Sequence, residues 1–484
     1  MRDPGAETAY LFRHAMLRDA AYSLQLPGDR GVLHALALLL IEDVLGDDTS
    51  ASAGELYAHA KTAAEVLPGN DGQRMSEKEL HYARQAADHA RDNYNPREAL
   101  AFYDLVLEHP LADPGQKFDA LFHGGSVLRF GGNFADALER YTRAGKLAGD
   151  DLRRSQLAGE QAEVQREIGD ATSAQAGYEQ CLELARKARD RAQEGLALGK
   201  LATLLHGAGR LDEAEARYGQ ALAIHRELGN RFQEGIVLGN FAALRQWQGR
   251  LDDAEQAFQA ALKLQEETGN ARFHAVTLGN YATLQSALEN SARARELYEE
   301  SIRQNRRLGS RRPLATFLSG LGAVDVHEDR YDDALERWRE ALAIHREIGS
   351  RPGVMSTLSN MAAVLLDQGE LERAQACAFE ARDILETVDL PRQEAPLRSV
   401  LGKLARRLGD LELAEQEFRR SLELFGRVNN PSGEATQHAN IGNVLEASGR
   451  HKEAEAEFAR ADELASRIGS ESLKRDIENA RRGA

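Results

Sequence analysis

The chain has 484 residues, 42% of them hydrophobic, and a formal net charge of -16. This length allows a large buried core, and the negative charge argues against a nucleic-acid partner, because neutralising phosphates requires a net basic surface. No apolar run approaches the roughly 18 residues that cross a bilayer, and residues 1–9 lack the regions of an export signal. We therefore expect a soluble, cytoplasmic protein with no membrane partner. Two cysteines, Cys181 and Cys377, are too few for a disulfide framework or a zinc site.

Residues 1–75 are predicted to form an amino-terminal helical segment. The sequence Y-L-F-R-H-A-M-L-R-D-A-A-Y at Tyr10–Tyr22, followed by Leu33, His34 and Ala35, resembles the region after the ATPase core of bacterial signal-transduction (STAND/AAA-like) ATPases. In such proteins this region leads to a carboxy-terminal repeat array. The chain contains no G-x-x-x-x-G-K-[ST] phosphate-binding loop, so we expect no nucleotide site and no cofactor.

Residues 76–468 repeat with a step of 40 residues over most of their length. The pattern G-R-L-D-E-A at Gly209–Ala214 returns as G-R-L-D-D-A at Gly249–Ala254. The alanine that ends this pattern serves as an anchor for each unit, and two slightly shorter steps precede the regular ones. The anchors are Ala99, Ala137, Ala174, Ala214, Ala254, Ala294, Ala334, Ala374, Ala414 and Ala454.

The residues around each anchor predict a pair of closely packed helices. An aromatic residue follows the anchor by four positions in every unit except the one with Ala378, and a mostly small residue follows by seven. This 0, 4, 7 spacing marks one face of a helix. A second small residue, such as Ala242 or Gly322, precedes each anchor by twelve positions and allows a preceding helix to approach closely. Glycines such as Gly209 and Gly229 mark the turns.

These observations predict an all-α fold, a right-handed α-solenoid of about ten helical hairpins. Residues 469–484 are expected to form a polar carboxy-terminal cap or tail. The order and spacing of the small, turn, anchor and aromatic residues resemble the tetratricopeptide repeat over residues 76–468. The long step and the L-G-N sequences at Leu238–Asn240 and Leu278–Asn280 are similar to long-repeat adaptors of the kinesin-light-chain type. The resemblance implies a scaffold that binds a protein or peptide segment in a concave groove lined by the first helix of each pair.

Four asparagines recur fourteen residues before the anchor, on the predicted first helices: Asn240, Asn280, Asn360 and Asn440. In the resembling adaptors an asparagine at this position clamps the backbone of the bound peptide. The side-chain amide suits that role, because it offers both a donor and an acceptor to a peptide group. The alternative is that these asparagines tie neighbouring repeats together.

Two further features are candidates for the groove. Lys403, Arg406 and Arg407 form a basic cluster that is unusual in so acidic a chain, and they suit an acidic segment or a terminal carboxylate. They also fit a solvated helix end, where cations favour the negative end of the helix dipole. Trp247, near the end of a first helix, fits an anchor for a ligand side chain or a cap on the turn.

The sequence predicts no catalytic residue and no metal site, and we expect no enzyme. The fourteen histidines form no metal-ligand pattern, and no serine or cysteine stands in a nucleophile motif. The predicted function is therefore a protein-protein interaction scaffold in intracellular signalling. Two alternatives stay open: a sensor or regulatory arm of a larger signal-transduction ATPase, cyclase or kinase, and a sensor of a peptide signal. The sequence does not determine the oligomeric state.

Overall fold

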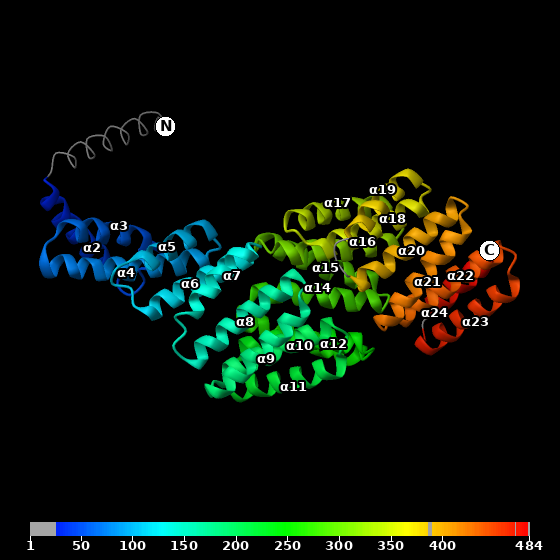
Figure 1. The fold of residues 1–484 in the computed structure, drawn as a ribbon, viewed down its shortest axis with the longest axis horizontal. Helices are drawn as coiled ribbons and strands as arrows, with labels where there is room; N and C mark the ends of the chain where they lie inside the picture. Colours follow the sequence, from blue (N-terminus) through cyan, green and yellow to red (C-terminus); the bar gives the residue numbers. More distant parts are fainter. Residues whose placement is uncertain (1–25, 386–389, 470, 483–484) are drawn as a thin grey trace, which may run out of the picture. The chain divides into compact units, whose positions relative to one another are not determined.

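The computed structural model describes residues 26–385, 390–469 and 471–482 (Figure 1). The resemblance at Tyr10–Tyr22 therefore lies outside the described residues. In the described ranges all regular structure is helical, which confirms the predicted all-α class. The chain forms two compact units that meet at Ala197 and Leu198, within one helix. None of the described helices is long and apolar enough to cross a membrane.

The first unit contains the helices up to α9 and the start of α10. Their bounds are α2 (Pro27–Leu45), the 3-10 helix η1 (Ser50–Ser52), α3 (Ala53–Val66), α4 (Gly69–Asp92), α5 (Pro96–Glu108), α6 (Pro114–Phe130), α7 (Phe134–Gly145), α8 (Asp151–Ile168), α9 (Ala171–Lys187) and α10 (Arg191–Gly207). The first helix pair, α4 with α5, begins at Gly69, a few residues before the predicted start of the repeats.

The second unit continues the same alternation of paired helices. Their bounds are α11 (Leu211–Glu227), α12 (Arg231–Trp247), α13 (Leu251–Glu267), α14 (Ala271–Ala287), α15 (Ser291–Arg307), α16 (Arg311–His327), α17 (Tyr331–Glu347), α18 (Arg351–Asp367), α19 (Leu371–Leu385), α20 (Pro391–Arg407), α21 (Leu411–Arg427), α22 (Pro431–Ala447), α23 (His451–Ile468) and α24 (Glu471–Arg482). Within each unit successive pairs stack on one another, which makes both units helical solenoids (Figure 1).

Large side chains packed on small ones hold each pair together, as the sequence predicts. All ten anchor alanines are fully buried, and the aromatic residues that follow them are buried as well. A Cβ added at Gly125 would lie 2.5 Å from Tyr141 Cε1, and one added at Gly402 would lie 2.7 Å from Phe418 Cδ1. Any larger residue at these glycines would push the two helices of a pair apart.

Local chemistry sets the ends of the helices. Gly209 (φ 79°) and Gly229 (φ 63°) take the left-handed conformation that glycine adopts without steric cost, so each turn closes within a few residues. Asn429 (φ 53°) replaces glycine at one such turn, and asparagine tolerates this conformation better than most residues. At helix starts, the side chain of Asn230 accepts a hydrogen bond from the Gln233 amide at 3.1 Å, which caps α12.

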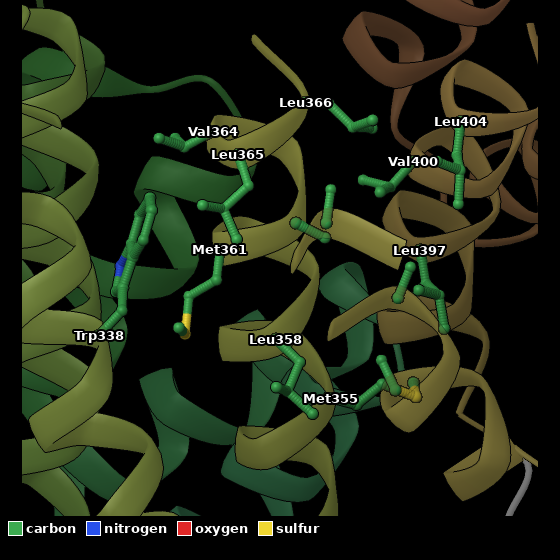
Figure 2. Close-up of a cluster of buried hydrophobic side chains, with 14 of the residues drawn as sticks. Trp338, Met355, Leu358, Met361, Val364, Leu365, Leu366, Leu397, Val400 and Leu404 are labelled. Atoms are coloured by element: carbon green, nitrogen blue, oxygen red, sulfur yellow. The ribbon is translucent and has the colours of Figure 1, made fainter. Parts of the chain in front are cut away.

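A buried cluster lies around α17, α18 and α20, and it includes Trp338, Met355, Met361 and Leu365 (Figure 2). Nearby, the fully buried carboxylate of Asp325 on α16 is neutralised by three arginines. Its oxygens lie 2.7 Å from Arg295 Nη2, 2.9 Å from Arg330 Nη2 and 2.6 Å from Arg337 Nε. A buried carboxylate needs such partners, because burial of an unpaired charge is strongly unfavourable.

The two ends of the described chain differ in how they are covered. The helix α24 packs against α22 and α23 and buries Leu473 and Ile477, so it covers the apolar face of the last pair. At the other end, α2 buries Leu38 but leaves Leu36, Leu40 and Val44 largely exposed. The apolar face of the last helix pair is therefore covered, whereas part of the apolar face of α2 is exposed.

Candidate ligand-binding face

The first helix of each pair in the second unit presents one narrow accessible stripe. In α14, from Ala275 to Gln285, only Val276, Asn280 and Thr283 are accessible, because the remaining faces contact the partner helix and the adjacent pairs. One turn beyond on either side, Arg272 and Ala287 extend this line. The spacing of four, four, three and four residues follows one side of a helix. We call this line, with its equivalents in the other first helices, the accessible stripe.

All four predicted asparagines lie on the accessible stripe and are half-buried. They occupy the middle of α12, α14, α18 and α22. Asn440 Nδ2 donates a hydrogen bond to Gln437 Oε1 on its own helix at 3.2 Å. Among the described residues the amides of Asn240, Asn280 and Asn360 have no hydrogen-bond partner, and none of the four bonds to a neighbouring repeat.

The accessible stripe carries the opposite sign of charge from the chain as a whole. From α12 to α22 its charged side chains are five cations and one carboxylate: Arg272, Arg312, Arg392, Lys403, Arg407 and Asp367. The net charge of the chain is -16. The acidic residues therefore concentrate on other surfaces, and the stripe is a locally basic line on an acidic chain.

The basic cluster predicted from the sequence lies in the last turn of α20. Lys403 is half-buried, whereas Arg406 and Arg407 are exposed. Within residues 26–385, 390–469 and 471–482 no acidic side chain forms an ion pair with these three. Partial desolvation and repulsion from Arg407 lower the pKa of Arg406. By contrast Arg398, on the same helix, is paired with Glu394 and Glu417.

Trp247 makes a contact that the sequence did not predict. Its side chain is 53% exposed, and the Arg392 guanidinium carbon lies 4.8 Å from the centroid of its ring. His206 meets the same indole edge-on, with 6.0 Å between ring centroids. The three residues come from α12, α20 and α10, so side chains of distant repeats meet at one place within the second unit. Burial and the nearby Arg392 lower the pKa of His206 to about 4.

No signal in the sequence marks Arg392 or His206 for this cluster. Their positions differ within the repeat, and Arg392 is several repeats away from Trp247. The arrangement depends on how much each pair rotates relative to the next, and this rotation accumulates along the solenoid. The candidate residues are thus in three groups: the asparagines spread along the stripe, the basic cluster at the end of α20, and Trp247 beside Arg392.

The described residues contain little that suggests catalysis. They hold no group of three or more His, Cys, Asp or Glu side chains placed to bind a metal ion. Cys181 is buried, and its carbonyl accepts a hydrogen bond from Ser155 Oγ at 2.7 Å. Burial raises the pKa of the Cys377 thiol, which opposes formation of the reactive thiolate.

Stacked helix pairs that leave one accessible stripe on every first helix define a helical-repeat scaffold. A family profile described as tetratricopeptide repeat matches residues 153–227, 233–307, 313–387 and 393–471, which is more than half of the chain. The chain belongs to the tetratricopeptide repeat family. The pairs before residue 153 have the same architecture but lie outside the matched ranges.

In a comparison of folds the chain is similar to solved structures, among them the following three. A Rap protein complexed with competence and sporulation factor has a TM-score of 0.51 at 12% identity, over 78% of this chain and 99% of that one. The apo quorum sensor NprR from B. thuringiensis has a TM-score of 0.49 at 14% identity, over 74% and 98%. BtubC (BKLC) from P. vanneervenii has a TM-score of 0.37 at 23% identity, over 47% and 93%. The first likeness shows a shared fold. No curated protein matches the chain.

Proposed function

We propose that the protein is a non-catalytic scaffold whose accessible stripe in the second unit binds a segment of a partner protein or a peptide. The observation that carries this proposal is the set of half-buried amides on successive first helices, three of which have no hydrogen-bond partner among the described residues. An amide left in this state satisfies its donor and acceptor through a ligand or water. Pairing with peptide groups makes such contacts independent of the partner's sequence.

Hydrogen bonds from the asparagines are not enough to hold a ligand. Each contributes about 0.5 to 1.5 kcal/mol, so four contribute about 4 kcal/mol, whereas association costs about 4 to 15 kcal/mol. Other contacts must therefore contribute to binding, and charged side chains also make it selective. The cations of the stripe, together with the basic cluster Lys403, Arg406 and Arg407, favour a segment rich in aspartate or glutamate.

A second candidate function is the sensing of a peptide signal. It is favoured by the shared fold with a Rap protein that was solved in complex with competence and sporulation factor. A third context, the regulatory arm of a signal-transduction ATPase, rests on the resemblance at Tyr10–Tyr22 alone. Both place the same stripe in intracellular signalling, and they differ in the size of the ligand.

Removal of the four amides tests the proposed site. A variant with Asn240→Ala, Asn280→Ala, Asn360→Ala and Asn440→Ala is expected to bind its partner at least tenfold more weakly at unchanged helicity and melting temperature. Partners are captured from cell lysate on the wild-type chain, and a purified segment of the captured partner is then titrated by calorimetry.

A matched control removes the same number of amides from exposed positions of the second helices: Gln180→Ala, Gln220→Ala, Gln259→Ala and Gln416→Ala. This control is expected to keep wild-type affinity. Equal affinity of the asparagine variant and the control would contradict the proposed site.

A further inference from the structure

Arg392 differs from most arginines of the second unit in what surrounds it. It lies in the first turn of α20 on the accessible stripe, and among the described residues it forms no ion pair. It lies beside the ring of Trp247 and the turn at Gly209, where an added Cβ would lie 3.7 Å from Arg392 Nη2. Partial desolvation lowers the pKa of Arg392, although the group stays charged at neutral pH.

Stacking on an indole leaves the binding edge of a guanidinium free. In a stacked pair the flat face of the guanidinium lies against the ring and its N–H donors point outward in the plane. Those donors match the two oxygens of a carboxylate, which they bind with two parallel hydrogen bonds. The Arg392 guanidinium carbon lies over the Trp247 ring, 4.8 Å from its centroid, and this contact restricts the side chain before any ligand arrives, so that less freedom is lost on binding.

The rest of the cluster favours an anion over a cation. His206, whose ring meets that of Trp247 edge-on, is neutral at neutral pH because burial and Arg392 depress its pKa to about 4. Further along the stripe, in the last turns of α20, Lys403 and Arg407 add positive charge of the same sign. The amino-terminal end of α20 contributes the partial positive charge of its helix dipole near Arg392.

From this geometry we infer that Arg392, oriented by Trp247, is a binding site for a carboxylate of the ligand. The inference rests on the proposed function of the accessible stripe and specifies one subsite of it. The carboxylate comes either from an acidic side chain or from the carboxy terminus of the ligand. When bound, it pairs with Arg392 at the point where α10, α12 and α20 meet.

Short peptides and the indole resonance of Trp247 provide a direct test on the full chain. The probes are acetyl-Glu-Glu-Glu-amide for side-chain carboxylates, acetyl-Ala-Ala-Ala with a free carboxy terminus for the terminal one, and acetyl-Gln-Gln-Gln-amide as the uncharged reference. The chain has two tryptophans, so Trp247→Phe assigns the resonance. We expect at least one acidic probe to shift it saturably, with at least tenfold tighter binding than the reference.

Variants of the arginines separate this subsite from general attraction to the basic stripe. Arg392→Gln is expected to weaken the acidic probe at least tenfold, and Arg392→Lys, which keeps the charge but lacks the planar fork, several-fold. Arg272→Gln removes a stripe arginine at the equivalent position of α14 and should weaken the acidic probe far less than Arg392→Gln does.

The inference is overturned if neither acidic probe binds more tightly than the reference, or if Arg392→Gln and Arg272→Gln have equal effects. The capture experiment with the asparagine variant does not depend on these probes, so a scaffold without this subsite is recognised as such. A shift with only the free-acid probe assigns the site to a carboxy terminus, and a shift with only the glutamate probe assigns it to side chains.

Discussion

Two neighbouring hairpins of the second unit fill the space between their helices in different ways. In α16 and α17, Trp338 packs on Gly322, and its Nε1 donates a hydrogen bond to the Ser319 carbonyl at 3.0 Å. In α18 and α19, Ala378 stands at the position of the tryptophan, opposite Ala362. Both alanines are fully buried, so the second hairpin closes around its interior as well as the first.

Ala378 belongs to a buried cluster of aliphatic and sulfur-containing side chains. Met355, Met361 and Leu365 of α18 are buried in the same cluster (Figure 2). Methionine has flexible torsions and fills irregular gaps, whereas a tryptophan on a glycine allows one arrangement and one hydrogen bond. The comparison teaches that a hairpin tolerates an alanine at the aromatic position when the residues on both helices stay buried.

The largest expected effect comes from removing the buried Trp338 side chain from the hairpin of α16 and α17. Trp338→Ala is expected to lower the free energy of unfolding by about 3 to 5 kcal/mol, because the cavity beside Gly322 cannot be filled by neighbours. Trp247→Ala is the matched control, since this tryptophan is 53% exposed, and it should cost about 1 kcal/mol or less. Denaturant unfolding, with hydrogen exchange on α16 and α17, measures both. Similar losses for the two variants would contradict the packing argument.

The second-largest expected effect is a loss of stability at acidic pH, through protonation of His345 at the end of α17. Burial and the nearby Arg312 lower the pKa of this 5% exposed side chain from 6.5 to about 4. The folded state therefore prefers the neutral ring. The resulting stability is fully present above pH 6.5 and is lost as the pH falls from 6.5 to about 4. By linkage the loss amounts to at most about 3 kcal/mol.

The chain offers a control for this acid effect. Phe425 occupies the equivalent position of α21 and packs on Gly433, as His345 packs on Gly353. A His345→Phe variant should keep the fold and show a smaller loss of stability between pH 6.5 and 4 than the wild type. Urea midpoints measured at several pH values provide the comparison, and parallel pH profiles for the two proteins would rule out this role of His345.

The smallest expected effect comes from adding the missing aromatic residue. Ala378→Trp should lower the free energy of unfolding by about 1 to 3 kcal/mol, because Ala378 is fully buried and an indole there overpacks the interior. The double variant Ala378→Trp with Ala362→Gly, which reproduces the tryptophan-on-glycine pair of α16 and α17, should recover part of the loss. Thermal unfolding of the three proteins measures the effect. If Ala378→Trp alone raised the melting temperature, the two hairpins would not be filled in the different ways described above.

Most of the fold was predictable from the sequence because the signals for it are local. The anchor alanines, the residues four and seven positions later and the turn glycines all describe one helix or one turn, where neighbours in sequence are neighbours in space. The same logic placed Asn240, Asn280, Asn360 and Asn440 on the first helices. Whether these asparagines bind a ligand stays a prediction, and so does the role of Lys403, Arg406 and Arg407.

The sequence by itself determined the repeat, the pairing of helices and the face that each helix buries, since these follow from a period within one short segment. The tertiary structure alone decided which side chains form the buried cluster around Ala378 and that Arg392 lies over the ring of Trp247. Those outcomes depend on side chains of different helices and on rotations summed over several repeats. A small change in each rotation moves distant side chains by many ångströms, and no local pattern records it.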